Sequence, residues 1–291
     1  MNEVHIPVLL ESVLKYLKPS AGESYLDLTA GYGGHADKIL EVTQNYNEAV
    51  LNDRDQNAID FLMAKYQVVK PKLMHDDFYS TALRLVENKQ RFDMILADFG
   101  VSSPQLDRDE RGFSFTKPAR LDMRMDQSQA LDAWTIVNEW SERKLAEIFQ
   151  VYGEEHSGRA KMLAREIVLN RPINTTTELA GLIKSKSPYM HVHPATRIFQ
   201  AIRIVVNDEL GEIERTLPLL PKLLKPGGRV AIISFHSLED RLVKTYFSEE
   251  SSEGIESQLK VLTKKPIIAD STEIVNNPRA RSAKLRVAEK I

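Results

Sequence analysis

Three glycines and an acid stand where a short apolar run meets a helix-like stretch. The run begins at Tyr25 and ends near Asp27, and the glycines are Gly31, Gly33 and Gly34. Because glycine has no Cβ, the backbone there can turn tightly and let a ligand approach closely. The following helix would point its free N–H groups at that ligand. A strand, a glycine turn and a helix in this order are typical of open α/β sheets that bind an adenosine-containing cofactor.

The acids near this turn discriminate between two classes of cofactor. Gly31-x-Gly33-x-x-Ala36 fits the dinucleotide fingerprint, and Asp53 follows at a suitable distance. Asp27, however, would face the ligand at the end of the first strand, where its charge would repel a pyrophosphate. S-adenosylmethionine has no phosphate and carries a cationic amino group and a cationic sulfonium. The charge favours S-adenosylmethionine, and an NAD-dependent oxidoreductase stays open as an alternative.

Further polar residues follow the other predicted strands. Asp53 is positioned to accept hydrogen bonds from both ribose hydroxyls, while Asp55 is expected to cap the next helix. Asp98 ends a strongly apolar run, and Ser103-Pro104 follows it. Amino-group methyltransferases carry a polar-Pro-Pro-aromatic motif after the fourth strand, whose oxygens turn the amine lone pair towards the methyl donor. Ser103-Pro104 matches half of that motif, and the other interpretation is an ordinary Ser-Pro loop.

Strands and helices alternate through the first hundred residues. This alternation predicts a parallel, doubly wound α/β sheet that binds its ligand outside the carboxyl ends of the strands. After residue 207, Pro218 and Pro221 should break a helical repeat, and residues 225–228 read as a turn. The expected strands lie over 25–28, 49–52, 72–75, 92–97 and 229–235, with helices near 36–42, 55–66, 80–88 and 239–247 and an antiparallel hairpin of 259–263 with 284–288.

The alternation stops between about residues 105 and 206, where we find no convincing strand. We therefore predict a discontinuous cofactor-binding domain over 1–105 and 207–291, with an inserted helical substrate-recognition domain over 106–206. Basic and aromatic residues near the start of the insert are expected to grip RNA and stack unpaired bases. These candidates are Arg111, Phe113, Phe115 and Arg120. The alternative is that the two phenylalanines belong to the core of the insert.

Composition excludes several chemistries. The chain has 291 residues, a net charge of −2 and no cysteine. Disulfides, thiolate zinc sites, iron–sulfur clusters and a cysteine nucleophile for methylating a pyrimidine ring carbon are therefore excluded. His191 and His193 have no clear third partner, so no metal is expected. Residues 1–18 read as an amphipathic helix rather than a signal peptide, and with no membrane-length apolar run we expect a cytoplasmic protein.

Taken together, the motifs resemble the bacterial small-subunit ribosomal RNA cytosine-N4-methyltransferase family. Phe99 stands where that family usually has Leu, and the region before Asn277 is short. The matching segments are Asp27-x-Thr29-x-Gly31-x-Gly33-Gly34-His35, Asp53-Arg54-Asp55, Asp98-x-Gly-Val-Ser-Ser-Pro-Gln-Leu-Asp107, Arg111-Gly-Phe-Ser-Phe115, Leu121-Asp-Met-Arg-Met125, Tyr152-Gly-Glu-Glu155, His193-Pro-Ala-Thr-Arg197, Phe199-Gln-Ala201, Ser234-Phe-His-Ser-Leu-Glu-Asp240 and Asn277-Pro-Arg-Ala-Arg-Ser282.

The resemblance implies a class I, Rossmann-like methyltransferase sheet with an inserted helical domain. It implies S-adenosylmethionine as cofactor and a cytosine in the decoding region of 16S rRNA, in the small ribosomal subunit, as substrate. Asp98, Ser103 and Pro104 would align the N4 amine. The cofactor residues carried over by position are Gly33, Gly34, His35, Asp53, Phe78, Asp98 and Gln105. A non-catalytic RNA-binding factor of the same fold stays open, as does a homodimer.

Overall fold

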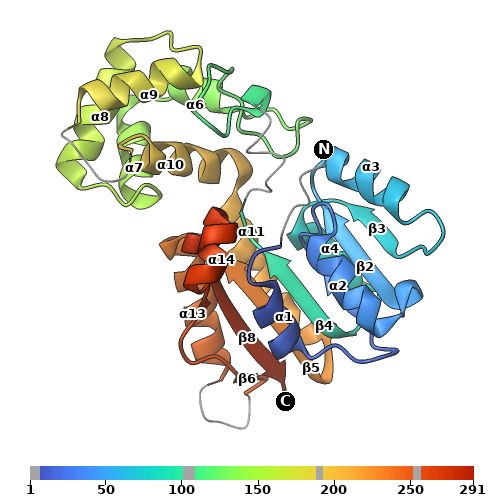
Figure 1. Ribbon diagram of the computed structural model, residues 1–291. Helices are drawn as coiled ribbons and strands as arrows, with labels where there is room; N and C mark the ends of the chain where they lie inside the picture. The colour runs from blue at the N-terminus through green and yellow to red at the C-terminus, as the bar shows by residue number, and fades with distance from the viewer. Residues whose placement is uncertain (1–6, 101–108, 188–192, 252–256) are drawn as a thin grey trace. The chain divides into compact units, whose positions relative to one another are not determined.

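The computed structural model describes residues 7–100, 109–187, 193–251 and 257–291 (Figure 1). The chain divides into two compact units. The first, the sheet unit, comprises Met1–Gly100 and Leu210–Ile291, and the second, the helical unit, comprises Val101–Glu209. The helical unit is therefore an insertion between two segments that build one sheet.

The sheet unit is built on a sheet in the order β3-β2-β1-β4-β5-β8-β6, with β7 paired to β8. Strands β1 to β5 run parallel, and β8 runs antiparallel to β5, β6 and β7. This is the mainly parallel, Rossmann-like α/β sheet that was expected, including the antiparallel strands at its end. The strands are β1 (Tyr25–Asp27), β2 (Ala49–Asp53), β3 (Lys72–His75), β4 (Phe92–Asp98), β5 (Leu224–Ser234), β6 (Leu259–Val261), β7 (Ile267–Ile268) and β8 (Lys284–Lys290).

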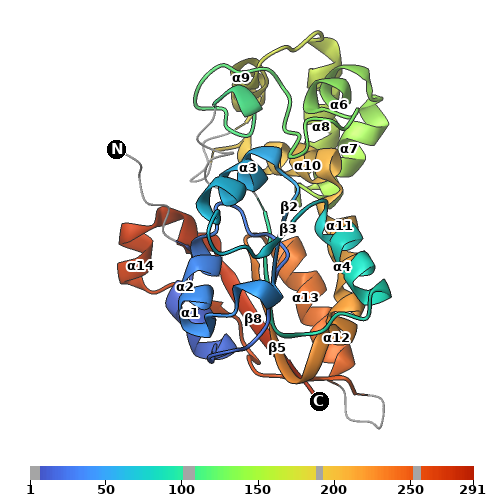
Figure 2. The ribbon, with the colours of Figure 1, turned by 90° about the vertical axis from the view of Figure 1, so that its right-hand side faces the viewer.

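Helices cover both faces of the sheet, because alternate strand residues are apolar on each side. Leu51 and Met94 belong to a core with α1, α2 and α3, whereas Val50 and Ile95 belong to a core with α4, α11, α12 and α13 (Figure 2). The helices are α1 (Leu10–Leu17), α2 (Gly34–Thr43), α3 (Gln56–Lys65), α4 (Phe78–Glu87), α11 (Glu209–Thr216), α12 (Leu220–Leu223), α13 (Ser237–Glu250) and α14 (Ser271–Asn276), with 3-10 turns η1 (Tyr46–Glu48), η3 (Leu217–Leu219) and η4 (Pro278–Ser282).

Two local predictions in this unit were wrong. Residues 225–228, predicted as a turn, lie inside β5. Leu224 pairs with Phe92 of β4, and the next paired residue, Arg229, pairs with Met94. The four residues between them therefore form a bulge in the strand. The N-terminal helix begins only at Leu10, because Leu9 has a left-handed backbone with φ of 55°. The break caused by Pro218 and Pro221 is confirmed, since α11, η3 and α12 follow one another there.

In the residues that the structure describes, the helical unit packs five helices around its own apolar core. It contains no strand in its described residues, and the bridge between Arg120 and Thr175 is isolated. Thr175 and Glu178 form the capping box that their spacing predicts at the start of α9. The elements are η2 (Asp109–Arg111), α6 (Ala133–Glu139), α7 (Glu142–Val151), α8 (Ser157–Leu169), α9 (Thr176–Ser185) and α10 (Thr196–Asn207). No described helix in either unit is both long and apolar enough to cross a membrane.

Candidate active site

Three acids meet at the carboxyl edge of the sheet. Asp27, Asp53 and Asp98 are the last residues of β1, β2 and β4, and these strands are direct neighbours in parallel. Ligands of open α/β sheets bind at this edge, near the point where strand order reverses. The topology therefore gathers the acids that the sequence singled out.

Asp53 holds the glycine turn in place. One carboxylate oxygen accepts from the backbone N–H of Gly31 and the other from that of Asp55, each at 2.8 Å. Burial, the largest cause, raises the pKa of Asp53 to about 6 despite these hydrogen bonds. Asp55 caps α3 as expected, through a 3.0 Å hydrogen bond from the N–H of Asn57. Asp53 is thus tied to both loops that border the candidate cofactor site.

Asp27 lies deeper, with only 1% of its surface exposed. Its carboxylate accepts from the hydroxyl of Tyr25 at 2.7 Å and from the N–H of Thr29 at 3.1 Å. Burial raises its pKa to about 7. The structure therefore places Asp27 beneath the turn, where its carboxyl group braces the backbone through Tyr25 and Thr29.

Asp98 supplies a buried oxygen atom, Oδ1, that has no hydrogen-bond partner in the described part of the chain. Its Oδ2 lies 3.8 Å from Nδ1 of His35. Burial, followed by the charges of Asp27 and Glu239, holds its pKa well above the ordinary range for aspartate. A buried carboxyl of this kind is stabilised by a cationic or hydrogen-donating ligand, so this site fits a positively charged cofactor.

The glycine turn can be built only from glycine at its crowded positions. Gly33 has φ of +77°, and an added Cβ would lie 3.0 Å from Leu62. A Cβ on Gly34 would lie 2.8 Å from Pro7. The next residue, His35, is buried in the first turn of α2 and bonds through Nε2 to the carbonyl of Val8 at 2.9 Å. The turn thus presents backbone, and no side chain of its glycines, to the edge of the sheet.

Phe78 begins α4, directly after the loop that follows β3. Its ring lies 5.4 Å from that of Phe99, which directly follows β4. The two rings pack together, and Phe99 is part of the core on that face of the sheet. Ser103, Pro104 and Gln105 lie outside the described residues.

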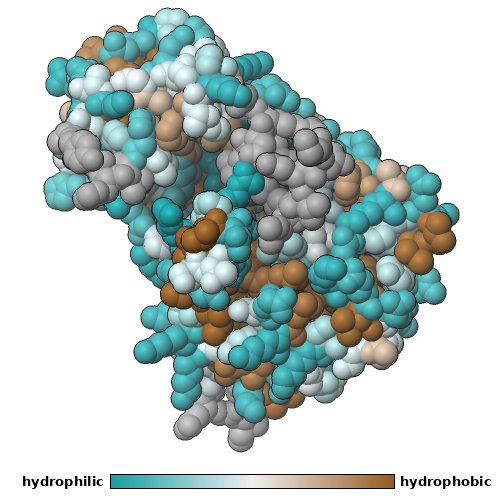
Figure 3. All heavy atoms as spheres, in the orientation of Figure 1, coloured by the Kyte–Doolittle hydropathy of each residue, from teal (hydrophilic) through white to brown (hydrophobic). Residues whose placement is uncertain are grey.

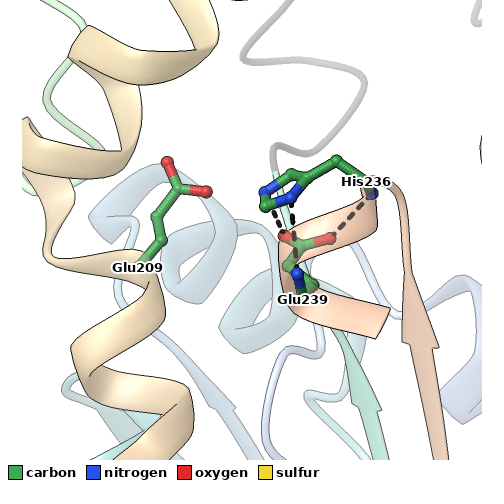
Figure 4. Close-up of side chains that lie close together, drawn as sticks. All are labelled: Glu209, His236 and Glu239. Atoms are coloured by element: carbon green, nitrogen blue, oxygen red, sulfur yellow. Dashed lines mark hydrogen bonds and ion pairs between the residues drawn. The ribbon is translucent and has the colours of Figure 1, made fainter. Parts of the chain in front are cut away.

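Sequence reasoning missed one buried acid, Glu239 in the first turn of α13. It accepts from the backbone N–H of Phe235 at 2.7 Å and of His236 at 3.1 Å, and it lies 3.1 Å from Nε2 of His236 (Figure 4). The His236 ring in turn accepts from the N–H of Glu239, which completes a capping box. The three-residue spacing from His236 to Glu239 was the available signal, because a capping box needs that spacing. The pair holds the loop that leaves β5.

The predicted RNA-binding residues of the helical unit differ in accessibility. Arg111, 3% exposed, donates to the carbonyls of Arg124 and Met125 at 3.0 and 2.8 Å. Phe113, 8% exposed, belongs to the core, as the alternative interpretation proposed.

The other two predicted RNA contacts are more accessible. Phe115 is partly buried, with its ring 4.8 Å from those of both Phe199 and His193. Arg120 is exposed and pairs with Asp132 at 2.8 Å. Arg120 and Phe115 are therefore the better placed of the four to contact a substrate.

The chain is similar to known proteins over nearly its whole length. A relative from Trichormus variabilis is 50% identical over 98% of this chain and 92% of its own length. One from Synechocystis is 48% identical, and one from Acidobacterium capsulatum is 43% identical over 99% of both chains. All three are named ribosomal RNA small subunit methyltransferase H. The model of the MraW methylase family matches residues 2–291, and the chain therefore belongs to the MraW methylase family.

Proposed function

We propose that this protein is an S-adenosylmethionine-dependent methyltransferase that acts on a cytosine of small-subunit ribosomal RNA, at the exocyclic N4. Family membership and the names of its relatives support a ribosomal RNA methylase. The observation that carries the proposal is the buried Oδ1 of Asp98, which has no hydrogen-bond partner among the described residues, at the edge where Asp27 and Asp53 also lie. A cationic methyl donor suits this concentration of carboxyl groups, whereas the pyrophosphate of a dinucleotide does not.

The residues of the edge have distinct tasks in this proposal. Gly31 and Gly33 let the donor approach the backbone, Asp53 binds its ribose, and Phe78 contacts its base. Gln105 completes the cofactor site. S-adenosylmethionine, when bound, supplies a methyl group activated by a sulfonium.

The target amine needs alignment, because its lone pair is delocalised into the cytosine ring. Asp98, Ser103 and the carbonyl of Pro104 accept hydrogen bonds from the amine, localise the lone pair and receive the proton. The base leaves its stack to reach this edge. The helical unit recognises the surrounding RNA, with Arg120 and Phe115 in contact with it. The substrate is the decoding region of 16S rRNA in the small ribosomal subunit. The enzyme acts in the cytoplasm, as a monomer or a homodimer.

A methyl-transfer assay tests the proposal. Wild-type protein should transfer labelled methyl groups from S-adenosylmethionine to small subunits isolated from cells that lack the activity. Asp98→Asn should lose about 100-fold or more of the rate, in the range of one lost acid–base group. Asp60→Asn, a change of the same kind on exposed α3, should retain it. Absence of transfer by the wild type, or a thermal shift with NAD and none with S-adenosylmethionine, would refute the proposal.

A further inference from the structure

The segment that leads into β8 carries exposed arginines at the same edge as the three acids. Lys284, the first residue of β8, pairs with Ser234, the last residue of β5. Because β5 is parallel to β1, β2 and β4, the chain just before β8 must lie at their carboxyl ends. That chain is α14 followed by η4, here termed the arginine platform (residues 271–282). Figure 1 shows α14 at the end of the sheet where β8 begins.

The platform is firmly attached to the sheet unit. Ala280 and Ala283 are fully buried, in the same core as Val8 and Leu9. Glu273 of α14 accepts from the backbone N–H of Leu9 at 2.6 Å. The residues on either side of Ala280 are exposed. Burial of Ala280 and Ala283, three residues apart, therefore fixes the backbone of η4, while Arg279 and Arg281 are exposed.

A three-residue segment connects the platform to the candidate cofactor site. The backbone N–H of Leu9 donates to Glu273 of the platform. The carbonyl of its neighbour Val8 accepts from Nε2 of His35 at 2.9 Å. Pro7 lies against the backbone of Gly34. The platform therefore borders the glycine turn, close to where the methyl group would be supplied.

The surface of the platform combines positive charge with apolar area. Val275 is 79% exposed, and Arg279 and Arg281 are exposed beside it. Figure 3 shows brown, apolar surface over α14 bordered by teal, hydrophilic surface. Asp270, directly before the platform, accepts from the N–H of Glu273 at 2.8 Å, and Glu273 accepts from that of Leu9. Outward guanidinium groups are suited to bidentate contacts with phosphate.

We infer that the arginine platform binds the sugar–phosphate backbone of the RNA substrate beside the nucleotide that is methylated. This inference rests on the proposed function, because it takes RNA to be the substrate. The chain as a whole is slightly negative, with a net charge of −2, so attraction of RNA depends on local positive surfaces. A basic surface at the catalytic edge can hold the backbone while a base turns towards Asp98.

A double substitution with a charge-matched control tests the platform. Arg279→Gln with Arg281→Gln should weaken binding of an unmodified small-subunit rRNA transcript by about tenfold. The slope of log affinity against log salt concentration should become shallower by about 1.4, or about 0.7 for each lost phosphate contact. The control is Arg91→Gln with Lys222→Gln. Both control residues are exposed and precede β4 and β5 at the opposite, amino edge of the sheet, so affinity should hardly change.

Cofactor titration and melting curves show whether the variants are folded. If the double variant does not fold, the single Arg281→Gln change should shift the salt slope by about half as much. Equal affinity and slope in platform and control variants would overturn the inference. Weaker binding to assembled subunits with unchanged binding to the naked transcript would also overturn it, because the platform would then contact a ribosomal protein. Methyl transfer by the wild type, measured on the same preparation, separately tests the proposed function.

Discussion

At the scale of single residues, the buried carboxyl groups of the proposed cofactor site should make the binding of S-adenosylmethionine dependent on pH. Burial raises the pKa of Asp53 to about 6 and of Asp27 to about 7, and holds that of Asp98 higher than usual. A cationic ligand favours the ionised carboxylates and releases their protons. We therefore expect the affinity for S-adenosylmethionine to rise by about tenfold or more between about pH 5.5 and about pH 8.

The same pKa shifts set the stability of the free protein in the opposite direction. An acid whose folded pKa is raised contributes stability that is fully present below its unfolded pKa and is lost as pH rises through the folded value. For Asp53 this loss spans the interval from about pH 4 to about pH 6.

Calorimetry in buffers of different ionisation enthalpy should detect proton release when S-adenosylmethionine binds near pH 6. Proton uptake, or an affinity independent of pH, would contradict the assignment of the cationic donor to this edge.

Asp53 provides a sharper test, because it lies between two loops. Asp53→Ala removes acceptors for Gly31 and Asp55 as well as the proposed ribose contact. We expect S-adenosylmethionine to bind about ten- to 150-fold more weakly, equivalent to about 1.5–3 kcal/mol, while the protein stays folded. Isothermal titration gives the affinity, and Asp60→Ala on the exposed surface of α3 is the control. An unchanged affinity would remove Asp53 from the site.

The sequence was informative about residues at strand ends and less so about side-chain direction. Asp53 and Asp98 could be placed at the sheet edge because each follows an apolar run that is buried on both faces. The sequence did not show that Asp27 bonds to the hydroxyl of Tyr25. It also did not show that Glu239 is buried near Asp98, because that contact joins segments far apart in the chain. Local spacing contains no information on such contacts, although it did contain the capping signal of Glu239.

At the scale of elements, the segment after η2 illustrates how one pattern can serve two purposes. Aromatics interleaved with basic residues suggest a surface that stacks bases, yet Phe113 packs into the core of the helical unit. Phe113→Ala should therefore lower the stability of that unit by about 3–5 kcal/mol. Thermal unfolding measures the loss, with Thr116→Ala at an exposed position of the same segment as the control. A large fall in RNA affinity per folded molecule, with an unchanged melting temperature, would instead restore the stacking role.

Helix and strand limits were predictable where local chemistry decides them. Asp55 and Thr175 begin helices by side-chain caps, and Pro218 lies just after the end of α11. The predictions failed where the backbone is controlled by distant pairing. The bulge in β5 exists because Leu224 and Arg229 both pair with β4, and no local signal reveals that the strand continues through Pro226 and two glycines.

At the scale of the whole molecule, chain order determines what the sheet unit can do. The strands before and after the insert join in one sheet, so β4 and β5 are direct neighbours although the whole helical unit separates them in sequence. The alternation of strands and helices predicted this parallel sheet. The glycine turn, the three acids and the arginine platform all lie at the carboxyl edge of this sheet. The helical unit is inserted after β4, close in sequence to Asp98.

The chemistry of the whole chain also predicts the identity of the product. Methylation of a pyrimidine ring carbon at position 5 requires a nucleophile that first adds to the ring, and a cysteine thiolate serves this purpose. The chain has no cysteine in any of its 291 residues. An exocyclic amine needs only to be aligned and relieved of a proton, and Asp98 offers an acceptor for both. We therefore expect N4-methylcytidine and no 5-methylcytidine in digests of the treated RNA. Mass spectrometry separates the two isomers by their base fragments, with untreated RNA as the control, and a ring-carbon product would disprove the mechanism proposed for this edge of the sheet.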